Sequence, residues 1–215
     1  MSTNHTVRDG EYLASIAASY GFADYITIWT HSQNASLKAQ RKNPNTLFPG
    51  DVVFIPDRET MECSAVTEKR HQFLMKQSPL RLRIVVKDED DQPIANASCK
   101  LTVEGETCDL TTDGNGLLEQ QIPPTAHEGT LLLKGETAAA NIEIPIKIGY
   151  LHPLEETTGV QARLNNLGYN AGEVGGEDME LLRSAVEEFQ IDHGLTPDGK
   201  WGPSFQAKLK EVYGC

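Results

Sequence analysis

The chain has 215 residues, 39% of them apolar, and a formal net charge of −12. This length is enough for more than one domain, and an acidic surface repels phosphate backbones, which disfavours nucleic acid and anionic membranes as partners. The acidity is not a tail, because residues 79–150 and 151–215 each carry six more acidic than basic side chains.

The first residues, MSTNHTVRDGEYLASIAASYG, lack a basic region followed by an apolar core. We therefore expect cytoplasmic synthesis without a Sec signal. No apolar run approaches the roughly 20 residues of a membrane helix, so membrane insertion is not expected.

The four cysteines have no metal-ligand spacing, and we expect reduced thiols. They are Cys63, Cys99, Cys108 and Cys215. A two-residue turn at Glu104 and Gly105 would place Cys108 opposite Leu101, so a bond between Cys99 and Cys108 would need another register.

The first block is predicted to have the order strand, helix, helix, strand. Residues 6–8 form a short strand, and apolar residues at i, i+3, i+4 and i+7 over 13–20 mark one face of a helix. A second helix is expected near residues 24–31. Residues 52–55 form the closing strand before a proline.

Residues 58–78 are polar and are interpreted as a connector, with a strand conceivable near 71–75. From residue 79, LRLRIVVKD alternates apolar and basic residues, as a half-buried strand does. Strand-like segments separated by Gly, Asn and Asp turns continue to residue 150. The pattern predicts a small antiparallel β-sandwich without helices.

Residues 151–215 are predicted to form three short helices around one small core. Apolar stripes at helical spacing begin at Val160, Leu181 and Phe205, and glycine-rich segments separate them. Blocks of roughly 70 residues or fewer bury only small cores, a size typical of binding modules and poor for an enzyme with a deep cleft.

Two segments of the first block, HTVRDGEYLASIAASYG and LFPGDVVFIP, resemble a LysM domain, a module for N-acetylglucosamine-containing glycans. The resemblance implies a shallow groove between the strand–helix loop and the second helix–strand loop. The groove residues would be Gly10, Glu11, Tyr12, Asn34, Pro49 and Gly50. Two features depart from the family: the insertion THSQNASLKAQRKNP lengthens the second loop, and Glu11 and Tyr12 replace smaller residues. By pattern, Tyr12 is the most exposed candidate aromatic residue.

In the second block, VVKDEDDQPIANASCKL followed by TTDGNGLLEQQIPP is similar to transthyretin-like or carboxypeptidase-regulatory sandwiches. That resemblance implies a spacer or adhesive surface without catalytic residues.

In the third block, GVQARLNNLGYNAG and AVEEFQIDHGLTPDGKWGP resemble a three-helix peptidoglycan-binding domain. The family's first Asp-Gly-x-x-Gly-Pro turn is replaced here by GGEDMELL, whereas the second survives as PDGKWGP. The resemblance implies glycan contacts from Tyr169, Asn170, Asp198 and Trp201. Trp201 is either a sugar platform or a core residue, and Tyr169 either a sugar contact or a packing residue.

No catalytic residues, metal ligands or cofactor are expected. The histidines lack the i, i+4 spacing of a zinc-binding helix, and no nucleophile motif is present. Asp178 is expected to cap a helix. The pair Asp192 and His193 is expected to have a structural role at a helix end.

The predicted fold class is a multidomain α+β chain: a LysM-like βααβ domain (1–57), a connector (58–78), the sandwich (79–150) and the three-helix domain (151–215). The segments DYITIWTHSQNASLKAQRKNPNTLFPGDVVFIPD and IGYLHPLEETTGVQARLNNLGYNAG look like parts of a bacterial family associated with type VI secretion and other contractile injection systems.

Two functional hypotheses follow. In the first, the protein is a non-enzymatic accessory that binds peptidoglycan or its fragments, and a contractile injection machine exports it to the periplasm. In the second, the protein is a cytoplasmic adaptor or scaffold that has lost glycan binding. It would load an effector or spike component through protein contacts.

Overall fold

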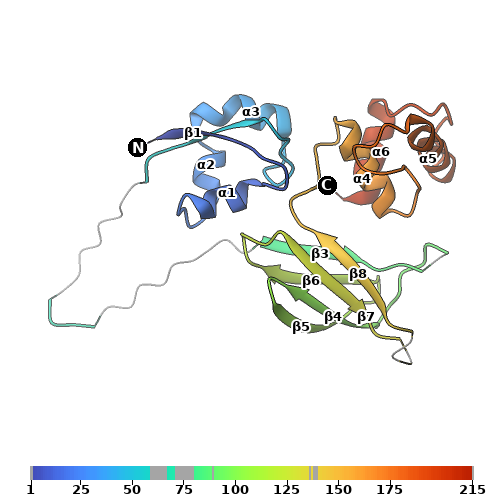
Figure 1. Cartoon of the computed structure of the whole chain (residues 1–215), viewed down its shortest axis with the longest axis horizontal. Coiled ribbons are helices and arrows are strands. Elements are labelled where there is room, and N and C mark those ends of the chain that lie inside the picture. The colour runs from blue at the N-terminus through green and yellow to red at the C-terminus, as the bar shows by residue number, and fades with distance from the viewer. Residues whose placement is uncertain are drawn as a thin grey trace. The chain divides into compact units, whose positions relative to one another are not determined.

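The computed structural model describes residues 2–58, 67–70, 80–88, 90–135, 137 and 140–214 (Figure 1). Its internal contacts divide the chain into two compact units. One unit comprises residues 1–45 and 49–149, and the other comprises 46–48 and 150–215. Most of the predicted connector lies outside the described residues, and so does the strand considered near 71–75. Among the described helices, none is long and apolar enough to cross a membrane.

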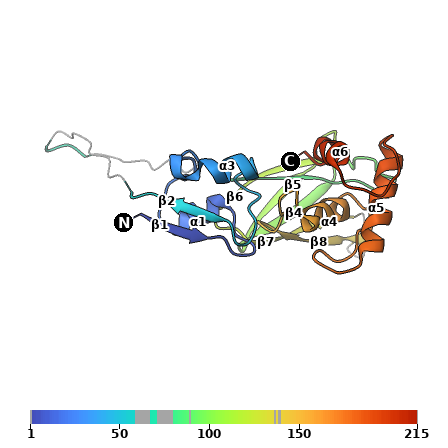
Figure 2. The same cartoon turned by 90° about the horizontal axis from the view of Figure 1, so that it is seen from above.

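Residues 2–58 form a two-stranded sheet with short helices between its strands. Figure 2 shows β1 and β2 side by side. The two strands are antiparallel, with Thr3 opposite Ile55 and Thr6 opposite Val52. The elements are β1 (Thr3–Thr6), α1 (Leu13–Ser19), α2 (Ile26–Trp29), the 3-10 helix η1 (Ser32–Asn34), α3 (Ala35–Arg41) and β2 (Val52–Ile55). The first strand therefore begins earlier than predicted. The segment interpreted as a loop insertion is largely helical.

Two polar side chains fix that insertion to the sheet. The buried Asn34 amide donates to the carbonyls of Ile28 (2.9 Å) and Phe54 (2.8 Å), and its oxygen accepts from the Phe54 N–H. Arg41 and Asp51 form a two-point ion pair at 2.8 and 2.9 Å, with side chains only 7% and 8% exposed. Because these bonds join η1 to β2 and the end of α3 to Asp51, just before β2, the insertion is part of the folded domain.

The second block is a β-sandwich, as predicted. One sheet pairs β3 with β6, and the other has the order β5-β4-β7-β8. The strands are β3 (Leu80–Val85), β4 (Ser98–Val103), β5 (Glu106–Thr111), β6 (Leu117–Ile122), β7 (Glu128–Leu133) and β8 (Ile142–Lys147). Leu101 lies opposite Cys108, which confirms the predicted register, and Cys99 and Cys108 are free thiols. Glu104 and Gly105 take the positive φ angles of a tight hairpin turn.

The third block consists of α4 (Thr157–Asn166), α5 (Met179–Asp192) and α6 (Pro203–Tyr213), which confirms the predicted helical domain (Figure 1). The core lies between the three helices and includes Leu164, Phe189 and Phe205. Asp178 caps α5, as predicted, because its carboxylate accepts from the N–H groups of Glu180 and Leu181. The cap of α5 and the apolar faces of the three helices therefore determine where the loops before and after α5 lie.

Candidate functional site

The strand–helix loop of the N-terminal block is held by hydrogen bonds around Glu11. Its carboxylate accepts from the Arg8 N–H (2.8 Å) and lies 2.7 Å from Nε2 of His5. Burial by itself raises the pKa of Glu11, but the hydrogen bonds from Arg8 and His5 outweigh it and leave that pKa lowered. Gly10, next to it, is buried with φ of 79°. The Glu11 carboxylate is therefore engaged in hydrogen bonds within the N-terminal block.

Tyr12 is buried, so the expectation that it is exposed was wrong. Its side chain is 2% exposed, and its hydroxyl donates to the carbonyl of Ala126, 2.7 Å away and 114 residues later. Burial and the Glu104 carboxylate both raise the pKa of Tyr12. The ring has no free face on which a sugar could stack.

The residues around Tyr12 come from the sandwich. His127 packs edge-on against the Tyr12 ring at 6.1 Å, and Tyr12 and Ala14 belong to the same apolar core cluster as the sandwich residues. A Cβ atom on Gly149 would lie 2.6 Å from Cδ1 of Tyr12, so only glycine fits there. Within this unit, the sandwich covers the loop that was predicted to form one wall of the groove.

The other proposed groove residues divide between core and surface. Asn34 is buried, and its amide hydrogen-bonds backbone groups, so its role is to hold the fold. Pro49 is half-buried. Gly50 is exposed with φ of 97°, and its N–H donates to the Val7 carbonyl. Of the six predicted groove residues, Tyr12, Asn34 and Gly10 are buried.

In the C-terminal block, Gln190 holds the surviving PDGKWGP turn. Its buried amide donates to Asp198 (2.9 Å) and to the Lys200 carbonyl (3.1 Å). Its oxygen accepts from the N–H groups of Asp198 and Gly199, both at 3.0 Å. These bonds use all four hydrogen-bonding positions of the glutamine amide. The bond from Gln190, followed by that from the Lys200 N–H, lowers the pKa of the exposed Asp198.

A buried glutamine also holds the loop before α5, but this loop lacks the aspartate. Gln161 of α4 is buried and accepts from the Gly175 N–H (3.1 Å), as Gln190 does from that of Gly199. Both glycines have positive φ. The residues GGEDMELL that replace this turn begin with two glycines and supply no aspartate at its start. The backbone of the first turn is retained, and its carboxylate is lost.

Tyr169 and Asn170 lie on that same first loop, beside the C-terminal end of α5. The Tyr169 hydroxyl donates to Asp192 (3.0 Å), lies 3.5 Å from Nε2 of His193, and its half-buried ring packs edge-on against Phe189. Asn170 is exposed. The C-terminal end of α5 therefore contacts both loops: Phe189 packs against Tyr169 of the first loop, and Gln190 bonds Asp198 of the second. Sequence reasoning missed Asp192 as the partner of Tyr169, since nothing local links residues 23 positions apart.

Trp201 is half-buried and packs against the apolar core of the three helices. It is therefore partly a core residue, as one of its two predicted roles required, while part of its side chain remains accessible. Exposed Asn170, Asp192 and Asp198 and the half-buried Trp201 are the residue types that contact sugars: amide, carboxylate and aromatic groups.

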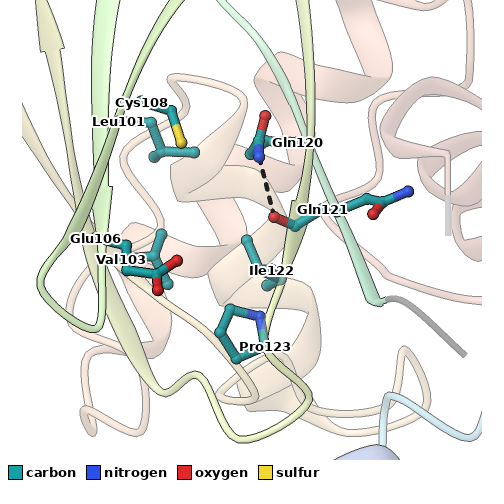
Figure 3. Close-up of a pocket in the computed structure, with 8 residues that line it drawn as sticks. All are labelled: Leu101, Val103, Glu106, Cys108, Gln120, Gln121, Ile122 and Pro123. Carbon is teal, nitrogen blue, oxygen red and sulfur yellow. Dashed lines mark hydrogen bonds between the residues drawn. The ribbon is translucent and has the colours of Figure 1, made fainter. Parts of the chain in front are cut away.

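The sandwich offers little room for a substrate. Figure 3 shows a hollow between β4, β5 and β6, lined by residues that include Cys108, Glu106 and Gln120. It holds about 30 Å³, far below the roughly 300–1,000 Å³ typical of small-molecule sites. Among the described residues, no group of three His, Cys, Asp or Glu side chains could hold a metal ion.

Two family profiles match parts of the chain. Residues 154–209 match a "Putative peptidoglycan binding domain", and residues 67–147 match the macroglobulin domain MG4. The predicted sandwich is thus similar to a macroglobulin domain, a family that the sequence patterns did not indicate. Comparisons with curated proteins and with solved structures find no significant match. The chain contains a helical peptidoglycan-binding-type domain near its C-terminus, which supports a peptidoglycan-binding role.

Proposed function

We propose that the protein is a non-enzymatic accessory that binds peptidoglycan through its C-terminal helical domain. The observation that carries the proposal is the family match over residues 154–209, together with a turn that Gln190 holds through four hydrogen bonds. Around the end of α5, exposed Asn170 and Asp198 and the accessible part of Trp201 supply hydrogen bonds and an apolar surface for a sugar ring.

In this proposal the wall is held at one site. The burial of Tyr12 and Asn34 leaves the LysM-like block without the groove that its sequence implies. A second glycan site would raise the avidity of the chain. With one site, affinity rests on the C-terminal domain, and the N-terminal block acts with the sandwich as a folded support.

The link to a contractile injection system is also part of the proposal. It is supported by the resemblance of the N-terminal and C-terminal segments to a family associated with type VI secretion. Export by such a machine would bring the protein to the periplasm, where peptidoglycan lies.

A second candidate function is that of an adaptor that contacts proteins instead of glycan. Two observations favour it: the sandwich covers Tyr12, and the first turn lacks the carboxylate that Asp198 supplies in the second. In this case neither LysM-like nor helical domain needs a sugar, and the partner is a secretion-machine protein or an effector.

Co-sedimentation of the full chain with purified sacculi, at low and moderate salt, separates the two candidates. We expect pelleting that survives moderate salt and is reduced in Asn170→Ala and Trp201→Phe, both chosen to leave the fold intact. Lys208→Ala, a change outside the end of α5, is the matched control and should pellet as the unaltered chain does. Failure of the unaltered chain to pellet at either salt concentration would favour the adaptor.

A further inference from the structure

The core face of the sandwich is incompletely covered at its edge strand β8. Successive residues of a strand point to opposite faces, so Ile142, Ile144 and Ile146 share one face. That face is the core side, because Ile144 lies opposite the fully buried Leu131 and Ile146 packs against the core cluster. Ile142 is nevertheless 58% exposed and Ile144 36%. Both side chains are therefore on the inner face of the sheet without the cover that the rest of this face has.

The unequal size of the two sheets explains the missing cover. The larger sheet has four strands with β8 at one edge, whereas the smaller sheet has two (Figure 1). In the smaller sheet β6 lies over β4 and β5, because residues of these three strands line the hollow. Its neighbour β3 follows on the side of β7 and β8, and Leu82 of β3 packs against the core cluster that includes Leu131. Strands in a sheet are about 4.8 Å apart, so one more strand beside β3 would extend the smaller sheet over the two isoleucines.

The outer edge of β3 has the main-chain groups that such a strand needs. The Val86 N–H donates to the Gly116 carbonyl (2.8 Å), and in an antiparallel pair every second residue faces the same neighbour. The N–H and C=O groups of Arg81, Arg83 and Val85 therefore point away from β6. Among the described strands, β6 is the one neighbour of β3. An edge of this kind is a template for a strand of another chain.

The outer edge of β8, by contrast, resists strand addition. The Ile148 N–H donates to the His127 carbonyl (2.9 Å), so the same alternation turns the main-chain groups of Glu143, Pro145 and Lys147 away from β7. A proline has no N–H to donate, and Pro145 is in the middle of this edge. A strand that covers the exposed isoleucines therefore pairs with β3 and not with β8.

The charges on β3 select the kind of strand. Arg81 and Arg83 lie on the outer face with side chains 58% and 65% exposed, and both contact one carboxylate, that of Glu119 on β6, Arg83 at 3.6 Å. Two guanidinium groups thus share one negative charge. Residues directly opposite each other in a pair of strands have their side chains on the same face. A carboxylate opposite each arginine is therefore favourable, whereas a second copy of β3 would place arginine beside arginine.

We propose that the edge of β3 binds an extended segment of a partner protein in which apolar and acidic side chains alternate. The segment adds as an antiparallel strand, the direction of every described strand pair in this sandwich. Its main chain bonds to Arg81 and Arg83, its carboxylates pair with their guanidinium groups, and its apolar side chains cover Ile142 and Ile144. The site belongs to the sandwich and is independent of glycan binding by the helical domain.

The first test uses the full chain and a labelled, capped peptide of about eight residues, slightly longer than a typical strand, in which isoleucine and glutamate alternate. Fluorescence anisotropy measures binding. One comparator has the same composition with the isoleucines and the glutamates in two separate groups, and another has lysine in place of glutamate. We expect the alternating acidic peptide to bind more tightly than both, and its affinity to fall with salt.

Main-chain methylation of the peptide tests strand pairing directly. Residues opposite Arg81 and Arg83 exchange hydrogen bonds with them, so the glutamate N–H groups face β3 and the isoleucine N–H groups face away. N-methylation of the glutamates should therefore abolish binding, and N-methylation of the isoleucines should preserve it. Equal losses from the two methylated peptides would overturn the proposal.

Protein variants locate the contact. Ile142→Ser combined with Ile144→Ser should weaken binding about tenfold. Val52→Ser is the control, since Val52 is a strand residue outside the sandwich and 52% exposed, and it should change binding less than about twofold. Arg83→Glu should also weaken binding, whereas Lys100→Glu, on the outer face of β4, should not. Sacculus pelleting should be unchanged in all four variants, which separates this proposal from that of glycan binding.

Equal binding of the alternating and grouped peptides would overturn the proposal, and so would equal effects of the isoleucine variant and Val52→Ser. Absence of binding at about 1 mM peptide would overturn it as well, because the edge would then be filled by another part of this chain or closed to strands. Light scattering tests the remaining occupant. A dimer of the full chain that the isoleucine variant dissociates would mean that a second copy covers β8, and would contradict a separate partner.

Discussion

Replacing Tyr12 tests whether the LysM-like block and the sandwich fold as one unit. Tyr12→Phe removes only the hydroxyl that donates to the Ala126 carbonyl at 2.7 Å. A buried hydrogen bond contributes about 1 kcal/mol, and leaving the carbonyl unpaired brings the cost to roughly 1–3 kcal/mol. Tyr12→Ala also removes a ring that is 2% exposed, and such truncations cost about 3–5 kcal/mol.

Equilibrium unfolding in urea gives the free energy, and amide hydrogen exchange shows where it is lost. Because Tyr12 joins α1 to the sandwich core, we expect both variants to speed exchange in α1 and in β7 together. Exchange in α4, α5 and α6 should stay unchanged. Tyr20→Phe is the matched control, since the Tyr20 hydroxyl meets His5 within the N-terminal block, and it should leave β7 unaffected.

The reasoning would be refuted by a Tyr12→Phe variant whose unfolding free energy matches that of the unaltered chain. Faster exchange in α1 with an unchanged exchange rate in β7 would refute it equally, because the two blocks would then be stable independently of each other.

Three further predictions concern stability and pH. Arg41→Ala removes the two-point ion pair with the largely buried Asp51 side chain and should cost about 3–5 kcal/mol, measured by thermal unfolding. Gln190→Ala removes four hydrogen bonds from the PDGKWGP turn and should cost about 2–4 kcal/mol and reduce sacculus pelleting, whereas Gln161→Ala should affect pelleting less. The raised pKa of Tyr12 predicts stability that is fully present below about pH 10, the unfolded value, and falls by about 1.4 kcal/mol per pH unit above it. Tyr12→Phe should remove this loss, as urea titrations at pH 9 to 11 would show.

Periodicity predicted what local sequence determines. The helical spacing from Val160 onward and the alternation from Leu80 onward gave helices and strands, and the tight turn at Gly105 placed Leu101 opposite Cys108. The Asp178 cap also followed from its position before an apolar run. These features depend on residues that are neighbours in the chain.

Long-range contacts account for what sequence patterns missed. Tyr12 comes two residues after Gly10 in a loop, a position that usually indicates exposure, and its burial is explained by distant contacts: its bond to Ala126 and its packing in the sandwich core. The helical insertion depends on the Asn34 amide reaching Phe54, 20 residues later. Nothing in the sequence of α5 distinguishes Gln190 from other helical residues. Its role depends on hydrogen bonds to the turn that folds back beside it.

The central claim is that glycan contacts the C-terminal helical domain and not the LysM-like groove. Backbone amide NMR of the full chain, titrated with soluble N-acetylglucosamine–N-acetylmuramic acid fragments carrying stem peptides, tests it most directly. We predict chemical-shift changes at residues 169–170 and 198–202, with none at residues 10–12 or 49–50. Changes at residues 10–12 and 49–50 without any in the helical domain, or no changes anywhere, would contradict the account.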